Sequence, residues 1–162
     1  MNQIDPSTPN NLVALEDLLS CPCDAVVRAM SDIKGDILIL GVGGKMGPTL
    51  ARMAKRASDA AAVARRIIGV SRFSSPGLEQ QLNGWGVETI RCDLLDRTSI
   101  EQLPDAENIV FMAGMKFGAT ENPSLTWAMN CHVPALVSVR FRESRPEEHT
   151  SELQSRRHLV CR

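Results

Sequence analysis

The chain has 162 residues and contains no tyrosine; its aromatic residues are four phenylalanines and two tryptophans. Proton transfer by a phenol is therefore excluded. The net charge is only −1, so nothing in the charge balance indicates nucleic acid as a partner. No apolar run reaches the ~20 residues of a membrane-spanning helix. Residues 1–6 lack the basic start of a signal peptide. We expect a cytoplasmic protein without nucleic-acid or membrane partners.

Cysteine is present but shows no pattern that stabilises a fold or binds a metal. The five cysteines are scattered and odd in number, which is typical of reduced thiols in a cytoplasm. The only close pair is Cys21 and Cys23, and no second pair stands at metal-ligand spacing. We therefore expect no metal site, and interpret the pair as two small residues beside a helix end.

Apolar periodicity divides the chain into alternating helices and strands. This alternation predicts an α/β fold with a doubly wound parallel sheet, and the right-handed crossover rule predicts the strand order 3-2-1-4. Local signals set some helix boundaries. Ser75 is expected to cap a helix, Thr98 and Glu101 fit a capping box, and Pro134 is expected to kink or split the last helix. The expected strands are 36–40, 66–71, 87–92 and 108–113, and the longer expected helices are 12–19, 24–34, 45–57, 75–84 and 122–139.

A glycine-rich turn joins the apolar strand 36–40 to the helix that follows. Glycine lets the backbone turn sharply and approach a pyrophosphate closely, and a helix N-terminus offers unpaired N–H groups to phosphates. The strand–glycine–helix context is the one that a dinucleotide-binding motif requires. Lys45 can add a positive charge there; the alternative is a solvated lysine. The residues expected at this part of the site are Gly41, Gly43, Gly44, Lys45, Met46 and Gly47.

The end of the second strand bears on the choice of cofactor. NAD sites place an acidic residue there to bind the ribose 2′-hydroxyl. In this chain Ser71 and Arg72 occupy that position, and an arginine can pair with a 2′-phosphate. The sequence therefore favours NADP over NAD, with a solvated loop arginine as the alternative interpretation of Arg72.

The order and spacing of these motifs resemble the short-chain dehydrogenase/reductase superfamily, most closely its extended, epimerase/dehydratase-like branch. The glycines at 41, 44 and 47 match the family's pattern, over a resemblance that covers roughly residues 35–140. By that resemblance, Asp93 and Leu94 follow the third strand and contact the adenine, Ala113 and Gly114 line the nicotinamide side, and Asn130 matches an asparagine of the next helix. The alternatives are a loop cap for Asp93, close packing for Ala113 and Gly114, and a locally satisfied polar residue for Asn130.

The resemblance fails where the family carries its catalytic groups. The family uses a tyrosine with a lysine four residues later for proton transfer, and this chain has no tyrosine and no lysine after Lys116. We therefore assign no catalytic residue. Two functions are compatible with the residues. One is the NAD(P)-binding part of an epimerase/dehydratase-type oxidoreductase acting on a small or sugar-like substrate, itself inactive. The other is a non-catalytic NAD(P)-sensing regulatory protein.

Three parts are expected along the chain: an N-terminal helical extension over 1–34, the NAD(P)-binding domain over 35–145, and a tail over 146–162. A doubly wound fold needs a fifth strand after Val139, but the residues that follow are polar. We therefore expect a Rossmann domain truncated after about four strands. Residues 147–155 resemble the translation of a common short-read sequencing adapter, which favours a non-native tail over a genuine polar helix.

Overall fold

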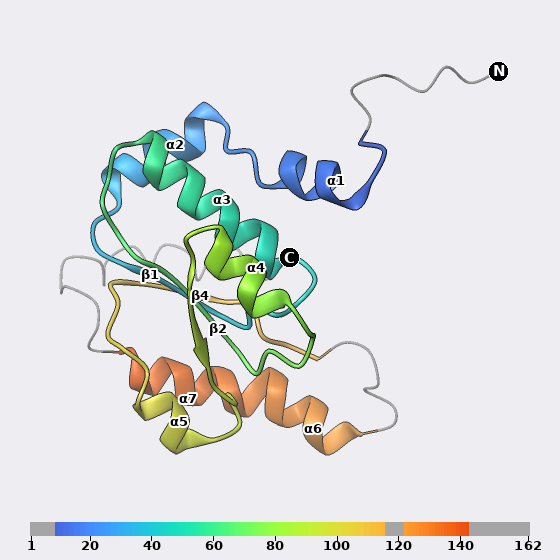
Figure 1. Cartoon of the computed structure of the whole chain (residues 1–162). Helices are drawn as coiled ribbons and strands as arrows, with labels where there is room; N and C mark the ends of the chain where they lie inside the picture. The colour runs from blue at the N-terminus through green and yellow to red at the C-terminus, as the bar shows by residue number, and fades with distance from the viewer. Residues whose placement is uncertain (1–8, 116–121, 143–162) are drawn as a thin grey trace, which may run out of the picture.

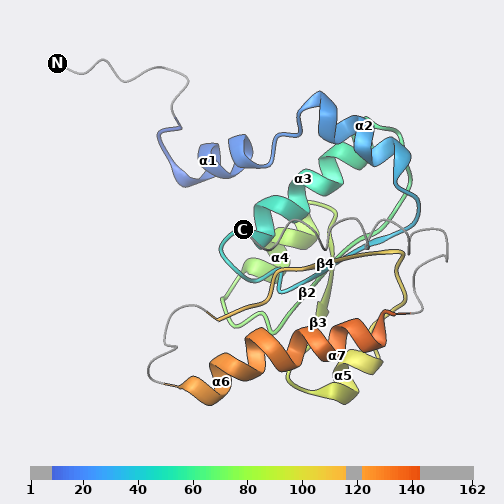
Figure 2. The same ribbon diagram turned by 180° about the vertical axis from the view of Figure 1, so that it is seen from behind.

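The computed structural model describes residues 9–115 and 122–142. Its four strands form one all-parallel sheet in the order β3-β2-β1-β4, with helices on both faces (Figures 1 and 2). This is the Rossmann-like α/β fold and strand order that the sequence predicts. Lys116 and the tail 146–162 lie outside the described residues. The elements are α1 (Leu12–Leu19), α2 (Asp24–Asp32), β1 (Ile37–Leu40), α3 (Gly47–Ala60), β2 (Ile67–Ser71), α4 (Leu78–Gly84), β3 (Glu88–Arg91), α5 (Arg97–Glu101), β4 (Asn108–Phe111), α6 (Pro123–Trp127), the π-helix η1 (Ala128–His132) and α7 (Val133–Arg140).

The sheet separates two apolar cores because successive side chains of a strand point to opposite faces. In β1, Leu38 and Leu40 pack toward the face covered by α5 and α7, while Ile37 and Ile39 pack toward the face covered by α2, α3 and α4. All four side chains of β1 are buried, as expected for the centre of a parallel sheet. The central strand therefore ends between two helical layers, which places the loop after it at the carboxyl edge of the sheet.

The helix that follows the glycine turn begins two residues later than expected and ends three residues later, over Gly47–Ala60 rather than 45–57. Lys45 and Met46 belong to the turn, which is closed by a hydrogen bond from the N–H of Gly47 to the carbonyl of Gly44 at 3.2 Å. The buried face of α3 consists of small side chains, which let the helix approach the sheet closely. These residues are Gly47, Ala51, Ala54, Ala57 and Ser58.

Two expected helix starts are wrong for local reasons. The helix expected from Ser75 begins at Leu78, after Gly77 has reversed the chain at φ +82°. The short helix α5 is capped by Asp96, whose carboxylate accepts from the N–H of Thr98 at 3.1 Å. Thr98 is therefore not the cap, because an aspartate two residues earlier satisfies the same helix end. Glu101 instead pairs with Arg97.

The last helix is split, as expected, but the change precedes the proline. Residues 128–132 form the π-helix η1, and Pro134 then lies in the first turn of α7. Proline has no N–H to donate to a carbonyl of the preceding turn, so the helical hydrogen-bond ladder is interrupted where η1 meets α7. The π-turn changes the direction of the side chains around it, so residues 127–132 do not follow the periodicity of an α-helix.

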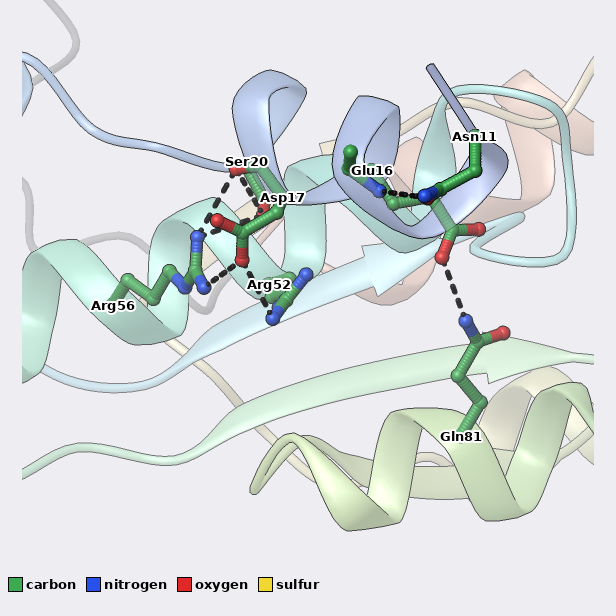
Figure 3. A network of polar contacts seen from close by, with 8 residues as sticks. Asn11, Glu16, Asp17, Ser20, Arg52, Arg56 and Gln81 are labelled. Carbon is green, nitrogen blue, oxygen red and sulfur yellow. Dashed lines mark hydrogen bonds and ion pairs between the residues drawn. The ribbon is translucent and has the colours of Figure 1, made fainter. Parts of the chain in front are cut away.

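The N-terminal helices pack against the domain in different ways. Helix α2 contributes Met30 to the core under α3. Helix α1 is attached through polar groups: Asp17 forms ion pairs with Arg52 and Arg56 of α3, and Glu16 accepts from Gln81 of α4 at 3.0 Å (Figure 3). Its four leucines stay between 39% and 69% exposed. Charge and hydrogen bonding, rather than apolar burial, therefore attach α1.

None of the helices within residues 9–115 and 122–142 has the length and apolar character needed to cross a membrane.

Candidate functional site

A pocket of about 250 Å³ lies at the carboxyl ends of the strands. The loops after all four strands contribute to it. In an open α/β sheet, ligands bind at the point where the strand order reverses. Here that point lies between β1 and β4, which neighbour each other although they are distant in sequence. The pocket lining consists of Gly41, Gly43, Gly44, Ser71, Arg72, Phe73, Ser74, Ser75, Leu78, Cys92, Asp93, Leu94, Met112, Ala113, Gly114 and Met129.

Packing inside the protein explains three of the four glycines in the β1–α3 turn. Gly41 has φ +88°, and a Cβ there would lie 2.6 Å from the backbone N of Ala113. A Cβ on Gly47 would overlap the carbonyl O of Val42, so the start of α3 packs directly on the turn. A Cβ on Gly43 would overlap the Oγ of Ser71. Backbone contacts therefore require glycine at 41 and 47, and the position of the Ser71 hydroxyl favours it at 43.

Gly44 differs from the other three. A Cβ there would meet only the carbonyl O of Gly41, at 3.4 Å, which is an ordinary contact. Its φ lies outside the left-handed region, so the backbone does not require glycine either. Gly44 is exposed and lines the pocket. The fold therefore leaves Gly44 unexplained, while open space lies where its side chain would be.

Some backbone N–H groups of this turn also lack a hydrogen-bond acceptor among the described residues. Within the described parts of the chain, the N–H groups of Gly43, Lys45 and Met46 have no hydrogen-bond acceptor. They stand immediately before α3, whose N-terminus carries a partial positive charge. Successive free N–H groups at a helix N-terminus form a site suited to an anion such as phosphate. The turn therefore offers donors and open space at the same point.

The loop after β2 forms a second side of the pocket. Ser71 is half-buried, and its Oγ accepts from the N–H of Phe73 at 3.3 Å. Phe73 is buried although its φ is +49°, a value that bulky residues rarely adopt. Arg72 is exposed, and its guanidinium has no ion pair or hydrogen bond with any residue in 9–115 or 122–142. Within the described residues, a cation without a partner thus lies at the pocket beside Ser74 and Ser75.

The loop after β3 supplies Cys92, Asp93 and Leu94. Asp93 is exposed, and its carboxylate accepts from the N–H of Leu95 at 3.0 Å, so it shapes its own loop while lining the pocket. Burial, and then the nearby carboxylates of Asp93 and Asp96, raise the pKa of the Cys92 thiol. The thiol therefore stays protonated at neutral pH and is a poor nucleophile.

The end of β4 is joined to the last helix by Asn130. Its Oδ1 accepts from the N–H of Met115 at 2.8 Å, and its Nδ2 donates to the carbonyl of Met115 at 2.9 Å. A Cβ on Gly114 would lie 3.3 Å from that Oδ1, so Gly114 lets the amide approach. Ala113 and Gly114 both line the pocket. Asn130 is thus satisfied by backbone groups, and it holds this wall of the pocket in place.

Most of the predicted site residues meet around one cavity although they come from four separate loops. Nine of the twelve line it. Lys45 and Met46 are exposed on the outside of the turn, and Gly47 acts through its packing on Val42. Sequence reasoning missed several lining residues. Four of these residues adjoin a predicted residue or motif, and that neighbour is the signal by which they could have been found: Ser74, Ser75, Met112 and Met129. Nothing in the local sequence indicated the unusual backbone of Phe73.

Within the described residues, no three His, Cys, Asp or Glu side chains are grouped so that they could hold a metal ion. Searches for similar proteins identify no family: neither any family model nor any curated protein matches this chain. The pocket itself is therefore the basis on which a function can be proposed.

Proposed function

We propose that the pocket binds a nicotinamide dinucleotide, with NADP preferred over NAD. On this proposal the chain is the NAD(P)-binding part of an epimerase/dehydratase-type oxidoreductase that acts on a small or sugar-like substrate. The observation that carries the proposal is Gly44, a glycine that neither packing nor backbone conformation requires. A pyrophosphate that must lie against the backbone gives a reason for it.

The donors around Gly44 fit a pyrophosphate. The N–H groups of Gly43, Lys45 and Met46 lack acceptors within the described residues, and they precede the N-terminus of a 14-residue helix. Phosphate oxygens would accept from these groups and gain from the helix dipole. Solvated Lys45 can add charge from outside the turn.

The other loops fit the remaining parts of the cofactor. The free guanidinium of Arg72 suits a ribose 2′-phosphate, and Asp93 suits the adenine amino group. Ala113 and Gly114 provide a wall of small residues for the nicotinamide side, positioned by Asn130. The bound nicotinamide would supply hydride transfer. The residues of this chain bind and orient the cofactor, and none is assigned a proton-transfer role.

Titration calorimetry with NADP and NAD tests the proposal. Gly44→Val should abolish or strongly weaken binding of both, because the side chain fills the space that the pyrophosphate needs, while the fold remains intact. Gly84→Val is the matched control, since Gly84 ends α4 away from the pocket and a Cβ added to it would meet no atom within 4 Å. Unchanged affinity in Gly44→Val would remove the dinucleotide from this turn.

A second function, a non-catalytic NAD(P) sensor, is favoured by one specific observation: the chain has no tyrosine for the proton transfer that its resemblance implies. A sensor is expected to bind NADP and NADPH with different affinities. The source gene beyond the codon of residue 145 separates the two functions. A Tyr-x-x-x-Lys motif in the same frame supports the enzyme, and its absence from the complete gene supports the sensor.

A further inference from the structure

The loop between β2 and α4 is held in an unusual backbone conformation. Phe73 has φ +49° and is only 6% exposed. A bulky residue in the left-handed region costs free energy, and it persists only where its surroundings determine it. The ring of Phe73 packs in the core under α3 and α4, and its N–H donates to the Oγ of Ser71. This loop also carries Arg72, so the strained residue stands next to the free cation of the pocket.

One side chain from the neighbouring strand contacts this loop at two points and the helix after it at a third. Arg91, the last residue of β3, donates from Nη1 to the carbonyl of Arg72 at 2.9 Å and from Nη2 to the carboxylate of Glu79 at 2.7 Å. Its guanidinium also lies 5.9 Å from the centroid of the Phe73 ring. The fork of an arginine can bridge a carbonyl and a carboxylate at once, which a lysine ammonium does less well. Arg91 therefore fixes the loop from outside.

The contacts of Arg91 bear directly on Arg72. The backbone of Arg72 is held through its carbonyl, while its own guanidinium remains without a partner in the described part of the chain. Glu79 stands in the first turn of α4, on the same loop–helix segment, and its charge is taken up by Arg91. Arg91 thus pairs with the carboxylate of Glu79 and holds the backbone of the residue that would meet a 2′-phosphate.

We propose that Arg91 is a positioning residue that sets the preference for NADP over NAD by acting through Arg72. The proposal rests on the proposed function, because it concerns the same dinucleotide site. Arg91 itself does not line the pocket. Replacing Arg91 should therefore change the ratio of the NADP affinity to the NAD affinity, while the affinity for NAD should change little.

The test measures the dissociation constants of NADP and NAD by calorimetry for wild type, Arg91→Met and Arg91→Lys. Arg91→Met keeps the aliphatic stem but removes both donors. It should weaken NADP binding about fivefold to tenfold, less than the loss of a direct charge-assisted contact, because Arg91 acts through Arg72. NAD binding should change less than about twofold. If Arg91→Met does not fold, Arg91→Lys replaces it. Arg91→Lys keeps the charge but loses the guanidinium fork, so it should also lower the preference for NADP over NAD. Arg97→Met is the control, since among the described residues Arg97 pairs only with Glu101 on α5.

A double-mutant cycle separates positioning from direct contact. In an Arg72→Ala background, Arg91→Met should leave the NADP/NAD ratio unchanged. A further loss there would mean that Arg91 contacts the phosphate itself, and an equal loss of NADP and NAD would mean a merely structural role; either result overturns the proposal. If wild type binds both dinucleotides equally, the proposal fails while dinucleotide binding stands. If wild type binds neither, it is the proposed function that fails.

Discussion

Asn130 and Met115 are joined by two hydrogen bonds that make the side-chain amide behave like the backbone of a neighbouring strand. The amide both accepts from and donates to the same residue, at 2.8 and 2.9 Å. It reaches Met115 from the π-helix η1, so the irregular turn of the last helix and the end of β4 are linked directly. This contact shapes the wall of the pocket formed by Ala113 and Gly114.

Replacing this amide should destabilise the fold modestly. Asn130→Leu removes two neutral hydrogen bonds at an exposed site, and each contributes about 0.5–1.5 kcal/mol. We expect a loss of about 1–2 kcal/mol in the free energy of unfolding, measured by urea denaturation. Ser138→Ala is the control, because in the part of the chain that the structure describes its exposed hydroxyl bonds only to the carbonyl of Pro134 in α7. Equal stability of Asn130→Leu and wild type would show that the contact is dispensable.

The glycines of the β1–α3 turn should separate folding from binding. Gly41→Ala forces a Cβ against the backbone of Ala113 in a left-handed conformation, so it should lower the melting temperature or prevent folding. Gly44→Ala has room for its Cβ and should melt close to wild type. Thermal denaturation followed by circular dichroism measures both. Equal melting temperatures for Gly41→Ala and Gly44→Ala would contradict the packing assigned to Gly41.

Arg72 should decide the cofactor preference. Wild type is expected to bind NADP more tightly than NAD, and Arg72→Ala should erase about tenfold or more of that preference, since a hydrogen bond to a charged group contributes about 1.5–3 kcal/mol. Raising the salt concentration should weaken NADP binding more than NAD binding. Calorimetric titrations at two salt concentrations measure both effects. A wild-type preference for NAD would show that the role of Arg72 is wrong.

The chain as it stands should show no dehydrogenase turnover. It contains no tyrosine, and no lysine follows Lys116, so the proton-transfer pair of the resembling family has no counterpart in it. Nicotinamide absorbance, followed with NADP and a panel of sugars and small hydroxy compounds, should remain constant. Binding measured on the same sample is the positive control. Turnover that Gly44→Val abolishes would refute this expectation and reveal a different proton donor.

Acid should release helix α1. The hydrogen bond and charge of Arg56, followed by Arg52, lower the pKa of Asp17 below its ordinary value of 3.8. A carboxylate with a lowered pKa contributes stability that is complete above the ordinary value and is lost as pH falls through the lower one. The NMR amide signals of α1 should therefore shift toward those of a free segment in that acidic range. Asp17→Asn should show the released signals already at neutral pH.

Asp32→Asn is the matched control for this titration. Asp32 ends α2 and makes no ion pair or hydrogen bond with its side chain among residues 9–115 and 122–142. In the Asp32→Asn variant, α1 should stay attached at neutral pH, and its amide signals should change with pH as they do in wild type. An Asp17→Asn variant with wild-type α1 signals at neutral pH would mean that the network of Figure 3 does not hold the helix.

The amino-acid sequence by itself determined the strands, their order and the location of the pocket. Ile37–Leu40 and Ile67–Val70 are apolar without interruption, as buried parallel strands must be, and glycines mark the turn after the first of them. These signals are local in the chain, and the right-handed crossover converts them into a topology. Nine predicted residues consequently line one cavity.

The tertiary structure decided what depends on groups distant in sequence. Phe73 adopts a positive φ because the core buries its ring and Arg91 fixes its loop from another strand. Gly41 and Gly47 are required by contacts with Ala113 and Val42, whereas Gly44 is left free, and the sequence shows all three as equivalent glycines. Local sequence patterns determine secondary-structure propensity and hydrophobic periodicity. The packing partners of a residue, and backbone strain such as that at Phe73, are determined only when the strands assemble into the sheet.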